Sequence, residues 1–180
     1  MIFTILFIIN NYFIKQDTVK NQFTIIKKIE NIEIRKYNES INASYFDSTS
    51  NNYFQFLANY IFGGNEKKQK ISMTSPVTMR LHGDKEMIFR LPDNFLFDSI
   101  PNPENPRIKI FRITPVTKAS IQYSGYSNTK IEKRKTEELI KTLKKHKIEY
   151  RNDFELNVYN PPYQFINRKN EITVTVTSNF

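Results

Sequence analysis

Apolar and polar residues alternate in short runs along most of this 180-residue chain, which is the pattern of half-buried β-strands. Residues 32–37 (IEIRKY) are one such run. We predict that residues 41–46 (INASYF) form their hairpin partner across Asn38, Glu39 and Ser40. Six further strands are expected at 70–82, 86–91, 108–114, 118–124, 155–160 and 171–176.

Two segments instead carry apolar residues at helical spacing. The first, 51–62, follows a run of hydroxyl side chains at 48–50 that offers helix caps. It ends at Gly63 and Gly64, because glycine accepts the left-handed conformation that closes a helix. Its residues at i, i+3, i+4 and i+7 are Phe54, Leu57, Ala58 and Ile61. A second helix is expected from about 128 to 147, with a buried stripe of Leu139, Ile140 and Leu143.

The chain contains an internal similarity. IEIRKYNESINASY, starting at Ile32, matches IKIFRITPVTKASI, starting at Ile108, at an offset of 108 − 32 = 76 residues. Further on, Pro76 matches Pro161 at an offset of 161 − 76 = 85, and the strand starts at residues 86 and 171 share that offset. We therefore predict pseudo-repeats at 32–91 and 108–176, with a seam between them where a ligand cleft would form.

The order strand, strand, helix, strand, strand, written twice, predicts an α+β fold in which an antiparallel sheet curls into a barrel-like body flanked by two helices. A connection with four prolines, residues 92–107, joins the two halves. The expected organisation is an N-terminal apolar segment and linker at 1–28, followed by a single domain at 29–180.

Composition narrows the chemistry. The formal charge of +9 favours anionic partners such as nucleic acid, anionic lipid or a carboxylated small molecule. The absence of cysteine excludes disulfides, thiolate nucleophiles and cysteine-ligated metal centres. The sequence has neither a G-x-S-x-G elbow nor a phosphate-binding glycine loop, so we expect a protein that is not an enzyme.

The N-terminus is apolar at residues 2–14, interrupted by Asn10 and Asn11. This run is shorter than the roughly 20 residues that span a bilayer, and it lacks the basic start and small-residue cleavage site of a secretory signal. We interpret it as a terminal extension, with a signal or anchor as the alternative, and favour a cytoplasmic location. Membrane contact is expected only through these residues.

Several motifs together resemble the SOUL/heme-binding protein family. The matching segments run in the family's order over about residues 29–176: IEIRKY (32–37), YIFGGN (60–65), KISMTSPV (70–77), FRLPDNF (89–95), SGYS (124–127) and YNPPYQFINRKNEITV (159–174). The resemblance implies a distorted β-barrel with two helices, built from a duplicated unit. It also implies non-covalent binding of heme or a related porphyrin in a shallow apolar cleft beside the first helix, closed by the loop before the last strand.

Carried over to this chain, the resemblance implies a set of heme-binding residues on the first helix and the late loop. They are Asn51, Phe54, Leu57, Ala58, Ile61, Tyr163, Gln164 and Phe165. From spacing alone, the helical stripe among them is better explained as core packing. Where other family members place Lys or Arg near the porphyrin propionates, this chain has Asn51, Asn59 and Gln164, with Arg168 and Lys169 as nearby substitutes.

An axial histidine is not expected, because His82 follows a strand at a turn and His146 falls in the lysine-rich end of the second helix. Coordination of iron would then come from Tyr60, Met73 or water. The preferred function is a monomeric, non-catalytic tetrapyrrole-binding protein that transports, buffers or senses its ligand.

Two other functions stay open. An effector-binding domain similar to those of gyrase-inhibitory proteins would hold a hydrophobic cation and need a buried carboxylate at the seam, for which Glu33, Glu86 and Glu171 are candidates, although glutamates at strand edges are usually exposed. A basic nucleic-acid-binding face on residues 128–147 is the less favoured alternative, because no recognised nucleic-acid-binding motif accompanies it.

Overall fold

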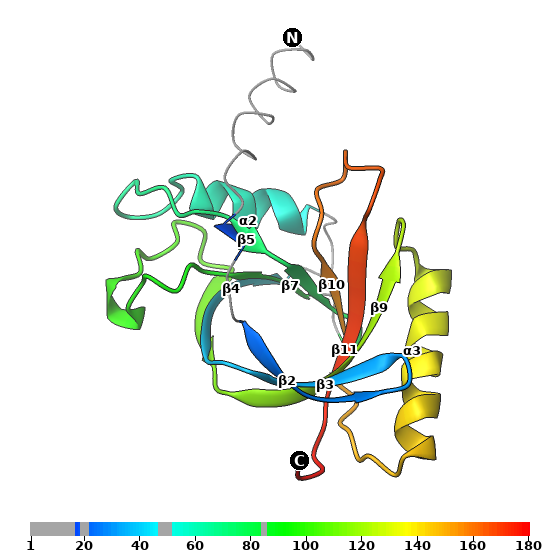
Figure 1. The fold of residues 1–180 in the computed structure, drawn as a ribbon. Coiled ribbons are helices and arrows are strands. Elements are labelled where there is room, and N and C mark those ends of the chain that lie inside the picture. Colours follow the sequence, from blue (N-terminus) through cyan, green and yellow to red (C-terminus); the bar gives the residue numbers. More distant parts are fainter. Residues whose placement is uncertain (1–16, 19–21, 47–51, 84–85) are drawn as a thin grey trace.

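A computed structural model describes residues 17–18, 22–46, 52–83 and 86–180, whose main body is one antiparallel sheet curled into a half-barrel (Figure 1). The strands are β2 (Phe23–Ile29), β3 (Ile32–Tyr37), β4 (Ser40–Phe46), β6 (Val77–Arg80), β7 (Glu86–Arg90), β8 (Ile108–Ile113), β9 (Val116–Ser124), β10 (Glu155–Val158) and β11 (Lys169–Thr175). Their order is β2-β3-β9-β11-β10-β6-β7-β4-β8, and a short parallel pair, β1 (Asp17–Thr18) with β5 (Thr74–Ser75), stands apart from this sheet. The predicted α+β class with a curled antiparallel sheet is confirmed.

The predicted hairpin between 32–37 and 41–46 is wrong. β3 pairs with β9, and β4 pairs with β8. Ile32 faces Ile121 and Tyr45 faces Ile108. The residue numbers of both pairs sum to 32 + 121 = 45 + 108 = 153, so the antiparallel register is the same in β3–β9 and in β4–β8. β3 and β4 therefore form one bent path antiparallel to β8 and β9. Alternation identified these strands correctly, but it carries no information on which strands pair.

The predicted linker also contains a strand. β2 pairs antiparallel with β3 across a tight turn in which Glu30 adopts a φ of 52°. Of the seven residues of β2 only Ile29 is buried, because β2 is an edge strand of the sheet. The apolar residues of β2, Phe23, Ile25, Ile26 and Ile29, do not keep the strict alternation of a strand, because the pairing register shifts between Ile25 and Lys27, so the pattern does not predict this strand.

The duplication stays a prediction. The constant register between 32–45 and 108–121 is what a twofold relation at an offset of 76 requires, but an ordinary antiparallel pair shows it too. In the later hairpins, Val77 faces Phe89 and Glu155 faces Thr173. In an antiparallel pair the two residue numbers of facing residues have a constant sum. If both strands of the first hairpin recurred 85 residues later, this sum would rise from 77 + 89 = 166 to 166 + 2 × 85 = 336, whereas the observed sum is 155 + 173 = 328. That part of the sequence match is not preserved in the strand register.

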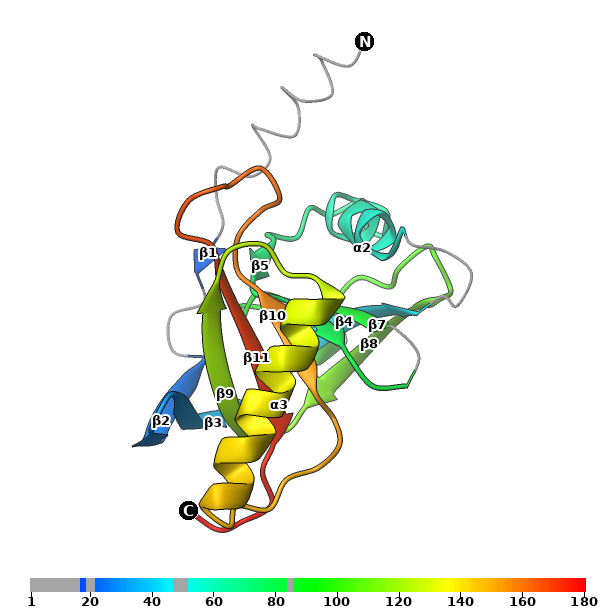
Figure 2. The same cartoon turned by 90° about the vertical axis from the view of Figure 1, so that its right-hand side faces the viewer.

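Two helices cover the outside of the half-barrel. The second, α3 (Thr129–Lys145), packs on β9 and β11 and buries Leu139 and Leu143, with Ile140 partly buried, as predicted (Figure 2). Its N-cap is Asn128, whose side chain accepts from the backbone N–H of Ile131. Neither helix in the described part of the chain combines the length and the apolar character that a bilayer span requires.

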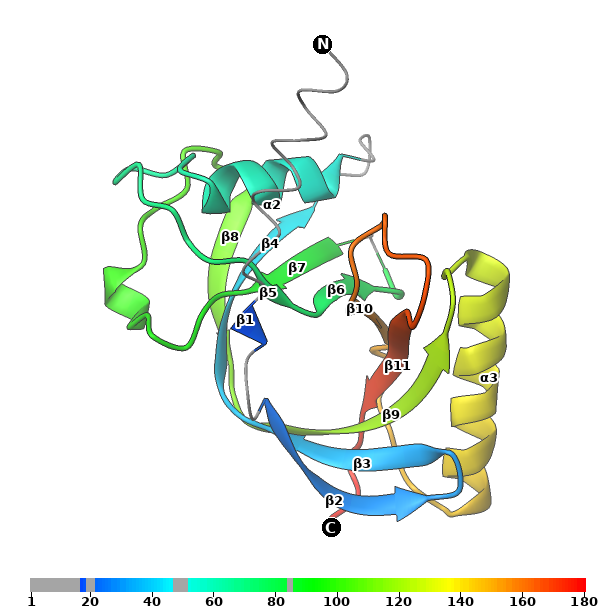
Figure 3. The same cartoon turned by 45° about the horizontal axis from the view of Figure 1, so that its top comes forward.

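The first helix, α2 (Tyr53–Ile61), packs on β4 and β7 at one end of the half-barrel (Figure 3). The hydroxyl residues expected to cap it lie outside the described residues, and its N-cap is Asn52. The helix ends as predicted, since Gly63 has a φ of 113°. A Cβ on Gly64 would lie 2.8 Å from the carbonyl oxygen of Asn59, so only glycine fits there.

Candidate functional site

The concave side of the half-barrel is lined by polar side chains. Residues 32, 34, 172 and 174 of β3 and β11 point outward into the core below α3, so their neighbours in sequence point inward. The inward set from these two strands is Glu33, Arg35, Tyr37, Glu171, Thr173 and Thr175. Most of these are buried, so their charges and hydroxyls must be satisfied by one another.

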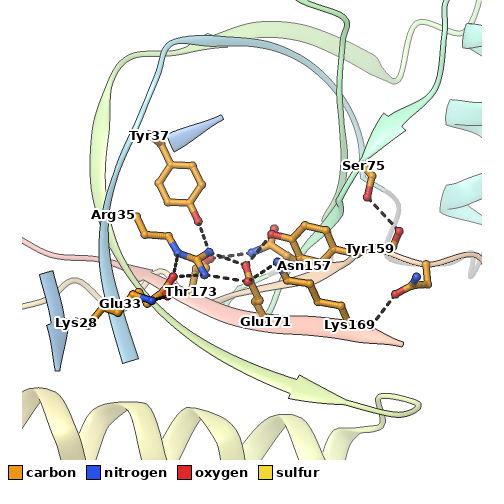
Figure 4. Close-up of polar contacts among 11 residues, drawn as sticks. Lys28, Glu33, Arg35, Tyr37, Ser75, Asn157, Tyr159, Lys169, Glu171 and Thr173 are labelled. Carbon is orange, nitrogen blue, oxygen red and sulfur yellow. Dashed lines mark hydrogen bonds and ion pairs between the residues drawn. The ribbon is translucent and has the colours of Figure 1, made fainter. Parts of the chain in front are cut away.

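A buried ion pair forms the centre of this network (Figure 4). Both nitrogens at the end of Arg35 donate to Glu171, with Nη1 to Oε2 at 2.8 Å and Nη2 to Oε1 at 3.0 Å. Arg35 also donates through Nε to Glu33 at 2.8 Å, and Lys169 lies 3.1 Å from Glu171. Glu171 has no solvent exposure at all, which corrects the expectation that the strand-edge glutamates are exposed.

Two tyrosines complete the network. The hydroxyl of Tyr159 donates to Glu171 at 2.7 Å, and that of Tyr37 accepts from Nη1 of Arg35 at 3.3 Å. Burial raises the pKa of Tyr37 to about 12 and moves that of Tyr159 upward as well, so both phenols stay protonated. Burial opposes ionisation of Glu171, but the hydrogen bonds and charge of Arg35 outweigh it and lower the Glu171 pKa. This carboxylate is therefore ionised and already compensated.

A second polar group lies on β10 and its neighbours. Lys118 pairs with Glu155, Thr78 donates to Asn157 at 2.7 Å, and Asn157 donates to Thr173 at 3.0 Å. These side chains line a cavity of about 70 Å³ inside the half-barrel. Sites for drug-sized ligands typically measure about 300–1,000 Å³. The interior cavity is far below the size of a porphyrin, so such a ligand must bind elsewhere.

The structure divides the predicted helical stripe between two faces of α2. Leu57 and Ile61 are fully buried in the core with Tyr53 and Tyr60, whereas 37% of Phe54 is exposed and Ala58 is partly exposed. The buried face is thus rotated from the predicted one, and it runs through 53, 57, 60 and 61. Asn51 lies outside the described residues.

The loop between β10 and β11 lies at the same end of the half-barrel as α2 (Figures 1 and 3). Tyr163 is 47% exposed and Phe165 77% exposed, and the Gln164 side chain donates to the carbonyl of Ile166. Arg168 is buried and binds backbone carbonyls of its own loop, which makes it unsuitable as a propionate anchor. Lys169 is engaged with Glu171.

The candidate axial ligands either lie in the core beneath α2 or lie away from that helix. The Tyr60 hydroxyl is buried and donates to the carbonyl of Pro101, and burial raises its pKa to about 12. Met73 packs against the core below α2. His82 lines a groove with Arg80 and Lys109, and His146 lies 2.8 Å from Glu30 at the far end of α3. Within the described residues, no cluster of three or more His, Asp or Glu side chains suits a metal ion.

Comparisons with known proteins agree on family and fold. The family model described as SOUL heme-binding protein matches residues 18–175. The C-terminal domain of EcmrR is similar in structure, with a TM-score of 0.61 and 11% identity over 82% of this chain and 98% of that one. A hydrolase from Listeria innocua has a TM-score of 0.57 and 11% identity over 84% and 94%. At these identities the likeness concerns the fold alone, and comparison with curated proteins finds no match.

Proposed function

Because the chain belongs to the SOUL heme-binding protein family, we propose that it binds heme or a related porphyrin without catalysing a reaction on it. The proposed site is the outer surface at the N-terminal half of α2, next to the loop that connects β10 and β11. Transport or buffering of the tetrapyrrole is the role that such a non-covalent site serves.

The position of apolar side chains is the observation that carries this proposal. The interior cavity of about 70 Å³ cannot enclose a porphyrin, and polar side chains such as those of Lys118, Glu155 and Asn157 are part of its wall. At the α2 end, by contrast, Phe54, Tyr163 and Phe165 keep 37%, 47% and 77% of their surface in solvent. A flat, mostly apolar macrocycle would cover such aromatic surface with its face and leave its carboxylates in water. Leu57 and Ile61 support this surface from below rather than contacting the ligand.

Iron is not needed for binding of this kind. Tyr60 is committed to Pro101, and both histidines lie away from α2. We therefore expect hemin and metal-free protoporphyrin to bind with similar affinity, through contacts on the ring face. The net charge of +9 would assist by long-range attraction of the propionates.

Titration of hemin and of protoporphyrin into the protein, followed through the Soret band, tests the proposal. Replacing the exposed Phe54 with Ser should weaken both titrations by about tenfold, the value of one large apolar contact. Ile25→Ser is the matched control, because Ile25 is 41% exposed but lies on β2, away from α2. A saturable shift that F54S leaves unchanged would place the ligand elsewhere, and no saturable shift would remove the function.

The effector-binding alternative receives less support. A buried carboxylate does lie at the centre of the sheet, as that alternative requires. However, Glu171 is already neutralised by a bidentate Arg35, and the adjoining cavity is small. A hydrophobic cation would have to displace the guanidinium from its partner, at the full cost of leaving a buried charge unpaired.

A further inference from the structure

We propose that the loop between β10 and β11 is a membrane-docking element that inserts Phe165 and Ile166 into the surface of an anionic bilayer. These two neighbours, which we call the tip of the loop, are 77% and 75% exposed. Adjacent large apolar side chains that protrude into water are unfavourable in a soluble protein and typically mark an interaction surface. Phe165 belongs to both proposed surfaces, but the membrane proposal is argued and tested without porphyrin, and it differs from the expectation that only residues 2–14 contact membranes.

The loop is built to hold its tip outward. The buried guanidinium of Arg168 donates to the carbonyls of Pro161 at 2.6 Å and Gln164 at 2.9 Å, and it stacks 4.3 Å from the ring of Tyr126. Gln164 closes a turn by donating its backbone N–H to Pro161, and its side chain donates to Ile166. These bonds fix the backbone on both sides of the tip, so the apolar pair is presented rather than folded inward.

The surroundings of the tip match the polar surface of a bilayer. The ring of Tyr126 lies 6.3 Å from that of Phe165, and both Tyr126 and Tyr163 are about half exposed. Tyrosine is enriched where proteins cross the membrane interface. Exposed Lys130 and Lys133 follow in the first turns of α3, at the same end of the molecule (Figure 1). Basic side chains beside an apolar tip favour anionic lipid as the occupant over a neutral protein surface.

The chain also enters the described fold beside this loop. Thr18 pairs with Ser75, and the hydroxyl of Ser75 donates to the carbonyl of Tyr159, where the loop begins. β1 therefore joins the fold beside the start of the loop that carries Phe165 and Ile166, and in the sequence the apolar residues 2–14 precede β1.

The sequence contains no tryptophan, so one introduced residue reports its own environment. Phe165→Trp in the full chain should shift its emission to shorter wavelength on addition of phosphatidylcholine vesicles containing phosphatidylserine, measured without porphyrin. Leu96→Trp is the matched control, because Leu96 is also 77% exposed but lies in the connection on the far side of α2, and its emission should not change. No shift in F165W, or an equal shift in L96W, overturns the proposal.

Co-sedimentation with the same vesicles gives a second readout. The full chain carrying F165S and I166S should lose at least about tenfold in partition coefficient, whereas L96S should stay within about twofold of the parent. K130E combined with K133E should lose about tenfold on phosphatidylserine vesicles and little on neutral ones. If Phe7→Ser abolishes binding while F165S and I166S leave it unchanged, contact runs through residues 2–14 alone and the loop has no docking role.

Discussion

The buried pair Arg35–Glu171 gives the sharpest test of how the half-barrel is stabilised. Replacing Arg35 by Met leaves the carboxylate of Glu171 fully buried, with the Tyr159 hydroxyl and Lys169 as its remaining partners among the described residues. Removal of one member of a buried ion pair typically costs about 3–5 kcal/mol. Because Lys169 lies 3.1 Å away and partly compensates the charge, we expect a loss near the lower limit, about 3 kcal/mol.

The partner substitutions separate the pair from its surroundings. Glu171→Gln leaves Arg35 with Glu33 at 2.8 Å, so its cost should be smaller, about 1.5–3 kcal/mol for a hydrogen bond to a charged group. The double substitution R35M with E171Q removes both charges and should cost less than the sum of the two single losses. The coupling energy of this double-mutant cycle should favour the native pair by about 2 kcal/mol.

Urea denaturation followed by circular dichroism provides the free energies. Domains of this kind have total stabilities of about 5–15 kcal/mol, so a loss of about 3 kcal/mol is large and still measurable. The reasoning would be refuted if R35M remained within about 1 kcal/mol of the parent, or if the double variant lost the sum of the two single losses. Either result would mean that water reaches the pair and screens it.

Three further predictions concern the stability of the same domain. Because the pKa of Glu171 is lowered in the folded state, ionised Glu171 stabilises the fold at pH values above its ordinary pKa of 4.5, and this stabilisation is lost as the pH falls below 4.5. The urea midpoint of the parent should therefore decline as the pH is lowered, and that of E171Q should decline less. Tyr159→Phe should cost about 1–3 kcal/mol in urea denaturation, because Glu171 loses a donor. Gly64→Ala should lower the free energy of unfolding by about 1–3 kcal/mol in thermal denaturation, because its Cβ would meet the Asn59 carbonyl at 2.8 Å, and an unchanged midpoint would contradict that contact.

Local patterns predicted the elements but not the connections between them. The alternation in 32–37 and 41–46 located β3 and β4 correctly, yet the residues that pair with them in β9 and β8 lie between 108 − 45 = 63 and 121 − 32 = 89 positions away in sequence. The pattern does not predict β2, because its apolar residues do not alternate strictly where the pairing register shifts between Ile25 and Lys27. On α2 the buried stripe is shifted by one position from the predicted one, so that Tyr53 lies in the core and Phe54 is exposed. A helix of nine residues is too short for the apolar periodicity to distinguish these two stripes.

The sequence contains charged residues within the predicted strands but does not indicate what they pair with. Charged residues at 33 and 35 and a glutamate at 171 alternate with the apolar residues at 32, 34 and 172. Where both faces of a strand are covered, such residues must find partners of opposite charge, and Arg35 and Glu171 are that match. The pairing could not be read from sequence, because it joins residues 136 positions apart.

The interior of the half-barrel disfavours binding of an apolar ligand, whereas the exposed surface at its α2 end favours it. Inward-facing side chains satisfy one another through Arg35, Glu171, Tyr159 and Asn157, and they leave only a small cavity. An apolar ligand entering there would have to break compensated hydrogen bonds and desolvate charges, which costs more than its own burial returns. Exposed Phe54, Phe165 and Ile166 impose no such cost, since covering them only removes apolar surface from water.

Both proposed partners, a porphyrin and a bilayer, are therefore directed to the α2 end by this difference between the interior and the outer surface. A porphyrin that partitions into the bilayer would reach the α2 surface without crossing water, so vesicle-bound hemin should transfer to the parent faster than to the chain carrying F165S and I166S.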